Sequence, residues 1–122
     1  KYVVAEAEYC RRCHKSKYEK WKTTPHAMAF ETLVHEHKDK QDRCVRCHVT
    51  GWQKSPGFWD QNLSPEFRDV QCTECHYVPL KHLKNPKKYH PQKIQENTCT
   101  RCHHKPKDDD FDFERDVKII RH

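Results

Sequence analysis

The clearest pattern of apolar and polar positions in this 122-residue chain predicts a helix from about Pro25 to Lys38. The apolar residues recur at the three- and four-residue spacing of one helix face, and they are Ala27, Met28, Phe30, Leu33 and Val34. Thr24 is of a type that caps helices, and proline suits the first helical position. A shorter helix is expected over residues 8–20.

Most of the remaining chain lacks a helical or strand period. Residues 49–70 and 78–95 are rich in proline, glycine or lysine and are predicted to be loops. Apolar residues alternate in part between Phe111 and His122, which indicates either a strand packed on the body or, over residues 108–122, an arm that reaches a neighbouring subunit. The prediction is one domain over residues 1–122, mostly α with extensive loops and little or no sheet.

The motif Cys-X-X-Cys-His occurs four times and uses all eight cysteines, which are Cys10, Cys13, Cys44, Cys47, Cys72, Cys75, Cys99 and Cys102. This motif is the attachment signature of c-type haem, in which two thiols bond to the haem vinyl groups and the adjacent histidine binds the iron. We therefore expect four covalently attached haem c groups. Their proximal iron ligands are expected to be His14, His48, His76 and His103.

Two other uses of paired cysteines have to be weighed. Eight cysteines could form two zinc clusters with four sulfur ligands each, or four disulfides in a small secreted domain. Neither use needs a histidine after every second cysteine. Histidine is 11 of the 122 residues, so four such histidines would arise by chance on the order of once in ten thousand. The pattern strongly favours haem.

The composition fits a protein whose interior is filled largely by cofactors rather than by apolar side chains. Only 34% of the residues are hydrophobic and the mean hydropathy is -1.24, which is polar for a chain with an ordinary core. We expect a small multihaem cytochrome c fold in which the haems act as the core. The formal net charge is +6, and each ferric haem with ionised propionates adds about one negative charge. Because the loaded protein is then nearly neutral, no nucleic-acid partner is expected.

No run of apolar residues is long enough for a transmembrane segment. Thioether attachment of haem takes place outside the cytoplasm, so we expect that a signal peptide was removed before Lys1. The expected location is extracytoplasmic, either periplasmic or at the cell surface and extracellular.

Seven histidines remain to bind the other faces of the four irons: His26, His35, His37, His82, His90, His104 and His122. His26 and His82 are the favoured distal ligands. His35 and His37 are two residues apart on the predicted helix and face different directions, so one of them is expected to bind. His90 and His104 are further candidates. His122 is expected at a frayed end, with ligation of a neighbouring subunit's haem as the alternative.

The chain resembles the cytochrome c-554 family of multihaem c cytochromes over roughly residues 2–103. The residues that carry the resemblance are Tyr18, Trp21, Thr24 to Ala27, Phe30, Cys44 to Gly51, Gly57, Phe58, Asp69 to His76 and His82. The resemblance implies that His26 and His82 are distal ligands and that the haems pack in parallel and perpendicular pairs. Small tetrahaem chains of this kind also resemble subunits of extracellular cytochrome filaments, in which one subunit's histidine completes a haem of the next.

The expected function is electron transfer with redox partner proteins, and no catalytic motif of a known enzyme class is present. The favoured form is a homo-oligomer that assembles head to tail into an extracellular filament or cell-surface conduit. A soluble periplasmic electron shuttle is the alternative. A small enzyme that reduces a nitrogen oxide at one open haem is the third hypothesis, and the surplus of histidines argues against it.

Overall fold

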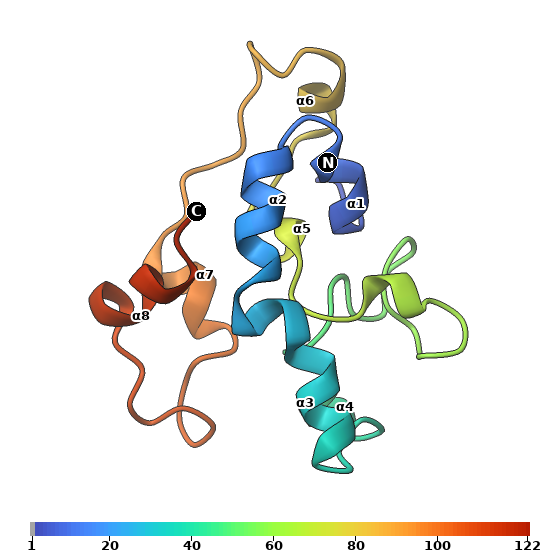
Figure 1. Cartoon of the computed structure of the whole chain (residues 1–122), viewed down its shortest axis with the longest axis vertical. Helices are drawn as coiled ribbons and strands as arrows, with labels where there is room; N and C mark the ends of the chain where they lie inside the picture. The colour runs from blue at the N-terminus through green and yellow to red at the C-terminus, as the bar shows by residue number, and fades with distance from the viewer. Residues whose placement is uncertain (1) are drawn as a thin grey trace.

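Short helices joined by long loops make up the computed structural model, which describes residues 2–122 (Figure 1). The helices are α1 (Ala7–Arg11), α2 (Lys15–Lys22), η1 (Pro25–Met28), α3 (Ala29–His35), α4 (Asp42–Val45), η2 (Pro65–Phe67), α5 (Cys72–Cys75), α6 (Leu80–Lys84), α7 (Glu96–Thr100) and α8 (Phe113–Ile120). Within residues 2–122, strand pairing is confined to two isolated bridges, Tyr2 with Pro79 and Val49 with Arg68. The mostly α architecture with extensive loops and little or no sheet is confirmed. No helix in this described part is long and apolar enough to cross a membrane.

The helix predicted from Pro25 begins as the tighter 3-10 turn η1 and continues as α3. Thr24 does not cap it, because its hydroxyl donates backwards to the Trp21 carbonyl oxygen at 2.7 Å. The cap comes instead from a distant segment: the Asp69 carboxylate accepts a hydrogen bond from the Phe30 backbone nitrogen at 2.9 Å. Local sequence could not show this contact.

The predicted boundaries differ from the observed ones at two further places. α3 ends at His35 rather than Lys38, because His37 adopts a left-handed conformation (φ 59°) that stops the helix. The helix expected over residues 8–20 is divided into α1 and α2. The division falls at residues 12–14, where the first cysteine motif makes its own turn.

A small apolar cluster forms the side-chain core. It consists of Phe30, Leu33, Val45, Val49, Phe58 and Phe67, and it fastens α3 to α4 and to the loop of residues 49–70. The Phe30 and Phe58 rings pack with their centres 5.5 Å apart. Because the buried members of this cluster come only from α3, α4, η2 and the loop of residues 49–70, the other helices depend on different contacts.

A buried polar network joins the N-terminal helices to the third cysteine motif. The Gln71 side chain accepts from the Ala7 backbone nitrogen at 2.5 Å and donates to the carbonyl oxygens of Glu66 and Arg68. The Gln71 backbone nitrogen donates to the hydroxyl of Thr50, which is fully buried. This network fixes the backbone immediately before Cys72, the first cysteine of the third motif.

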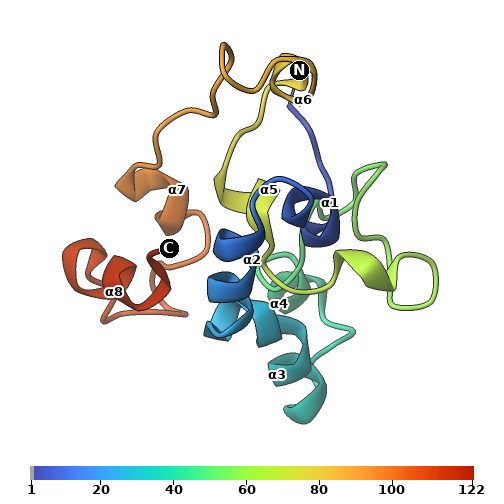
Figure 2. The same ribbon diagram turned by 45° about the horizontal axis from the view of Figure 1, so that its top comes forward.

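Helices α7 and α8 lie together, away from α3 and α4, in both views (Figures 1 and 2). The C-terminus returns to the side of α7. Residues 113–120, for which a strand was one of the two predictions, form the helix α8 instead. Asp112 caps it by accepting from the Arg115 backbone nitrogen at 3.3 Å. The helix ends only two residues before His122, which fixes where that histidine lies.

Candidate haem centres

Each Cys-X-X-Cys-His motif forms a tight helical turn that brings its two cysteines and its histidine together. In the first, third and fourth motifs the histidine backbone nitrogen donates to the carbonyl oxygen of the first cysteine at 2.9 Å. In the second motif His48 donates to Val45 instead, at 2.8 Å. The turn thus holds the two cysteines and the histidine of each motif close together along the chain, which is the spacing that haem attachment requires.

The cysteine side chains of residues 2–122 are neither joined by disulfides nor gathered in metal-binding clusters. All eight thiols are free, with no disulfide between them. Among residues 2–122, His, Cys, Asp and Glu side chains do not gather in groups of three or more that could chelate a metal ion.

Three of the four motif histidines face a second histidine from a distant segment. The pairs are His14 with His82 at 6.3 Å between ring centres, His26 with His103 at 6.1 Å, and His76 with His122 at 5.8 Å. Two metal–nitrogen bonds of about 2 Å, with about 1 Å more from each nitrogen to its ring centre, give a separation of about 6 Å. The spacing of all three pairs therefore fits one iron between two imidazoles.

Hydrogen bonds at Nδ1 fix the tautomer of several of these rings. His48, His82 and His122 bond through Nδ1 to the carbonyl oxygens of Ala29, Tyr89 and Ile120, at 2.7, 2.5 and 2.8 Å. A carbonyl oxygen can only accept, so Nδ1 carries the proton and Nε2 has a free lone pair. The Nε2 atom is then available to bind a metal, and the ring orientation is set by the backbone.

Burial favours the neutral form of two more of the facing histidines. It lowers the pKa of His26, and the neighbouring His103 and His48 lower it further. It also lowers the pKa of His76, with smaller contributions from His122 and His14. Only the neutral imidazole can bind iron, so these surroundings suit ligation.

A cavity of about 730 Å³ lies between the first and third motifs. Its walls carry Cys10, Cys13 and His14 of the first motif, Cys72 and His76 of the third, and the facing His82 and His122. The Cys10 and Cys72 thiols are close enough to interact, which lowers the pKa of Cys10 to about 7 and raises that of Cys72. Two of the expected attachment sites therefore adjoin one shared space of ligand-binding size.

The other motifs are also neighbours of one another. Burial and a hydrogen bond with Cys47 together raise the pKa of Cys102 to about 12, so the fourth and second motifs are adjacent. Between the third and fourth motifs, Glu74 pairs with Arg101 at 3.2 Å. The second carboxylate oxygen of Glu74 accepts from the Gly51 backbone nitrogen at 3.0 Å, three residues beyond the second motif.

The structure thus brings the two favoured distal candidates, His26 and His82, opposite motif histidines. It does not do so for the other four candidates. His35 ends α3 and is exposed, His37 and His104 are exposed, and His90 is exposed at the rim of the shared cavity. Within residues 2–122, no second imidazole faces His48. Ligation itself stays a prediction for all of these residues.

His122 is the residue that sequence reasoning missed. We expected a frayed end, whereas the structure places its ring opposite His76. The available signal was the spacing of Phe113, Val117 and Ile120, which is helical rather than alternating, together with the capping aspartate before them. If residues 113–120 are predicted to be a helix, the end of the tail is expected close to the rest of the chain.

Comparisons with known proteins agree with this geometry. Residues 9–77, more than half of the chain, match the family described as "Cytochrome c554 and c-prime". Cytochrome c-554 of Nitrosomonas europaea is 35% identical over 82 residues, which cover 55% of this chain and 35% of that protein. The chain thus matches about a third of the length of this curated relative.

The structure of reduced cytochrome c554 from the same organism superposes with a TM-score of 0.65 over 97% of this chain and 78% of that one. The sequence identity of that pair is 23%, so the likeness concerns the fold. It confirms the expected small multihaem cytochrome c fold. The free motif cysteines and the facing imidazoles fit covalently bound haem c. The chain is a multihaem c-type cytochrome and belongs to the cytochrome c554 and c-prime family.

Proposed function

We propose that this chain transfers electrons through four closely spaced haem c groups. The observation that carries the proposal is the set of three histidine pairs at the spacing of an iron with two imidazole ligands. Haem iron held on both sides exchanges single electrons and has no free position for a substrate. Membership of the family and the four attachment motifs support the same function.

The chain's own residues would hold the four groups as follows. The two cysteines of each motif form thioether bonds, and the motif histidine binds from one side. We assign His82 as the second ligand of the first site, His122 of the third and His26 of the fourth. The backbone bonds to Nδ1 of His82 and His122 keep these rings from turning, so the ligands stay in place when the charge of the site changes.

The contacts between motifs support one order of the sites. The first and third share a cavity, the third and fourth are joined by the Glu74–Arg101 ion pair, and the fourth and second meet at Cys102 and Cys47. From these contacts we infer the order first, third, fourth, second. The first and second sites then lie at the two ends, where electrons would enter and leave.

The finer proposal is that copies of this chain join head to tail outside the cytoplasm. His48 belongs to an end site and faces no second imidazole within residues 2–122, whereas His35, His37, His90 and His104 are exposed. A histidine from a neighbouring copy could complete the His48 site. Because such a contact joins two different surfaces, it would repeat into a filament.

The same observation favours a second candidate. If no neighbour supplies a ligand, the face opposite His48 stays open, and a small molecule such as a nitrogen oxide could bind there. The chain would then combine three transfer sites with one reactive site. A soluble shuttle is the remaining form, with redox partner proteins docking at the end sites.

The basic proposal is tested by counting cofactors and electrons. The intact mass should exceed that of the polypeptide by four haem groups, and a reversible potentiometric titration should take up four electrons per chain. The double variant Cys99→Ser with Cys102→Ser should lose one haem and one electron. Fewer than four of either in the unaltered protein would contradict the proposal.

The ligand assignment is tested at the residue that sequence alone did not favour. In dilute monomeric protein, His122→Ala should convert one more of the four haems to the high-spin form, because the third site loses its second imidazole. His37→Ala is the matched control and should leave the spectrum unchanged. An unaltered absorption spectrum for His122→Ala would show that His122 is not a ligand.

Assembly is tested by following the His48 site as the protein is concentrated. Dilute protein should show one high-spin haem that shifts on adding cyanide, and concentrated protein should form filaments in negative-stain micrographs while that signal disappears. Uniform small particles at high concentration would contradict the filament and leave the shuttle. An open site that persists and turns over nitrite or hydroxylamine would instead support the enzyme.

A further inference from the structure

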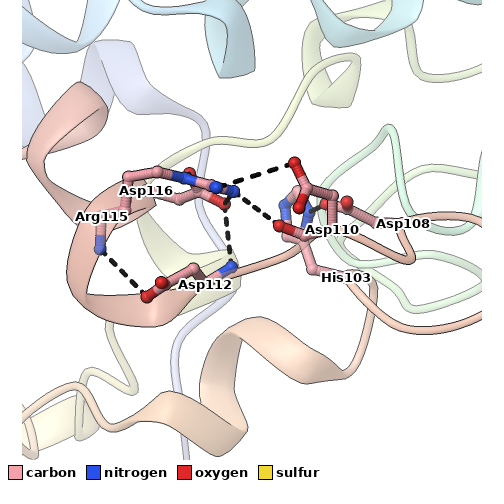
Figure 3. A network of polar contacts seen from close by, with 6 residues as sticks. All are labelled: His103, Asp108, Asp110, Asp112, Arg115 and Asp116. Atoms are coloured by element: carbon pink, nitrogen blue, oxygen red, sulfur yellow. Dashed lines mark hydrogen bonds and ion pairs between the residues drawn. The ribbon is translucent and has the colours of Figure 1, made fainter.

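The Nδ1 atom of His103 has a different kind of hydrogen-bond partner from the Nδ1 atoms of the other histidines in the proposed sites. The His103 Nδ1 lies 2.8 Å from an oxygen of the Asp108 carboxylate (Figure 3). The Nδ1 atoms of His48, His82 and His122 are bonded to neutral backbone carbonyl oxygens. A carboxylate carries a full negative charge, so its hydrogen bond draws the Nδ1 proton more strongly and raises the electron density on Nε2.

The fold holds this carboxylate in place. The backbone nitrogens of Lys107 and Asp108 both donate to the His104 carbonyl oxygen at 2.9 Å, which closes a turn between His103 and Asp108. On its other side the His103 ring stacks on Phe111, with ring centres 5.0 Å apart and planes 20° apart. The ring is thus fixed in the orientation that keeps its Nδ1 on the carboxylate.

The arginine beside this turn is paired with acids other than Asp108. Arg115 is engaged by Asp116 at 2.7 Å and by Asp110 at 3.6 Å, and it also donates to the Asp110 carbonyl oxygen (Figure 3). Asp112 caps α8 from the same cluster. The one arginine drawn in this network is therefore occupied by other acids, and the network as a whole carries more negative than positive groups.

We propose that Asp108 is a positioning residue that lowers the reduction potential of the fourth site by acting through His103. The inference rests on the proposed ligation of a haem by His103. Reduction of this site takes one electron from a neighbouring site and moves no atom. The oxidised site carries one more positive charge than the reduced site, so a fixed carboxylate on its ligand stabilises the oxidised form.

A potential step inside the path follows from this placement. The fourth site lies between the third and the second in the proposed order, because the Glu74–Arg101 pair and the Cys47–Cys102 contact flank it. An electron that crosses the chain must pass this less readily reduced site. Asp108 would thereby set the rate of transfer between the two ends without touching the haem itself.

The test is a redox titration that follows each of the four haems separately by NMR. Asp108→Asn, which keeps the size of the side chain and removes its charge, should raise the potential of one haem and leave three nearly unchanged. We expect about a tenfold shift of that haem's oxidation–reduction equilibrium, or about 59 mV for one electron. The electron paramagnetic resonance signal of the same haem should change with it.

Two variants separate this role from general surface charge. Asp109→Asn removes the same charge one residue away, at an exposed position, and should shift the potential much less. Asp108→Glu should restore a potential near that of the unaltered protein. Equal shifts for Asp108→Asn and Asp109→Asn, or no shift for Asp108→Asn, would overturn the inference. If the unaltered protein still takes up four electrons in that case, the proposed function stands and only the role of Asp108 fails.

Discussion

This structure depends on one constraint. Pairs of imidazole rings face each other with their ring centres about 6 Å apart. Each such pair joins segments far apart in the chain, from His14 to His82, from His26 to His103 and from His76 to His122. Neutral rings held at this separation attract each other weakly, whereas two bonds to one iron would fasten the segments firmly. Under the proposed function, iron between the rings would hold these segments together.

The helices alone could not keep this arrangement. None of them exceeds eight residues, and isolated helices shorter than about 12 residues are marginal in water. The side-chain core is limited to the cluster around Phe30 and Phe58 on α3, α4 and the following loop. The polar network of Gln71 and Thr50 connects that cluster to the third motif by hydrogen bonds. Beyond it, α6, α7 and α8 would depend on the haem groups that we propose the motifs bind.

Local sequence predicted the features that depend on local chemistry. The four motifs and the helix after Pro25 could be recognised because spacing and turn residues specify them. The loop predictions for residues 49–70 and 78–95 were correct only in part, because these stretches also contain the short helices η2 and α6. The cap of α3 could not be recognised, since it comes from Asp69, 39 residues further along the chain. The pairing of His76 with His122 was missed for the same reason. A distant histidine can serve as a ligand only if the fold places it beside a motif histidine. That placement depends on the whole fold and not on the local sequence.

Under the proposed function, the four sites would have different roles. The three sites with facing imidazoles would transfer electrons, and the second site, with His48 alone, would be open to a neighbouring copy or a small molecule. The carboxylate on His103 adds a difference in potential to this difference in ligands. One short chain could thus set both the direction of the current and the point at which it leaves.

The central claim is that haem bound by these residues replaces a conventional core. It is tested most directly by far-UV circular dichroism of the haem-free polypeptide during heating, with the haem-loaded protein as reference. The account predicts no native-like spectrum and no cooperative transition without haem. A haem-free chain that shows the same helical spectrum and a cooperative melt would contradict it.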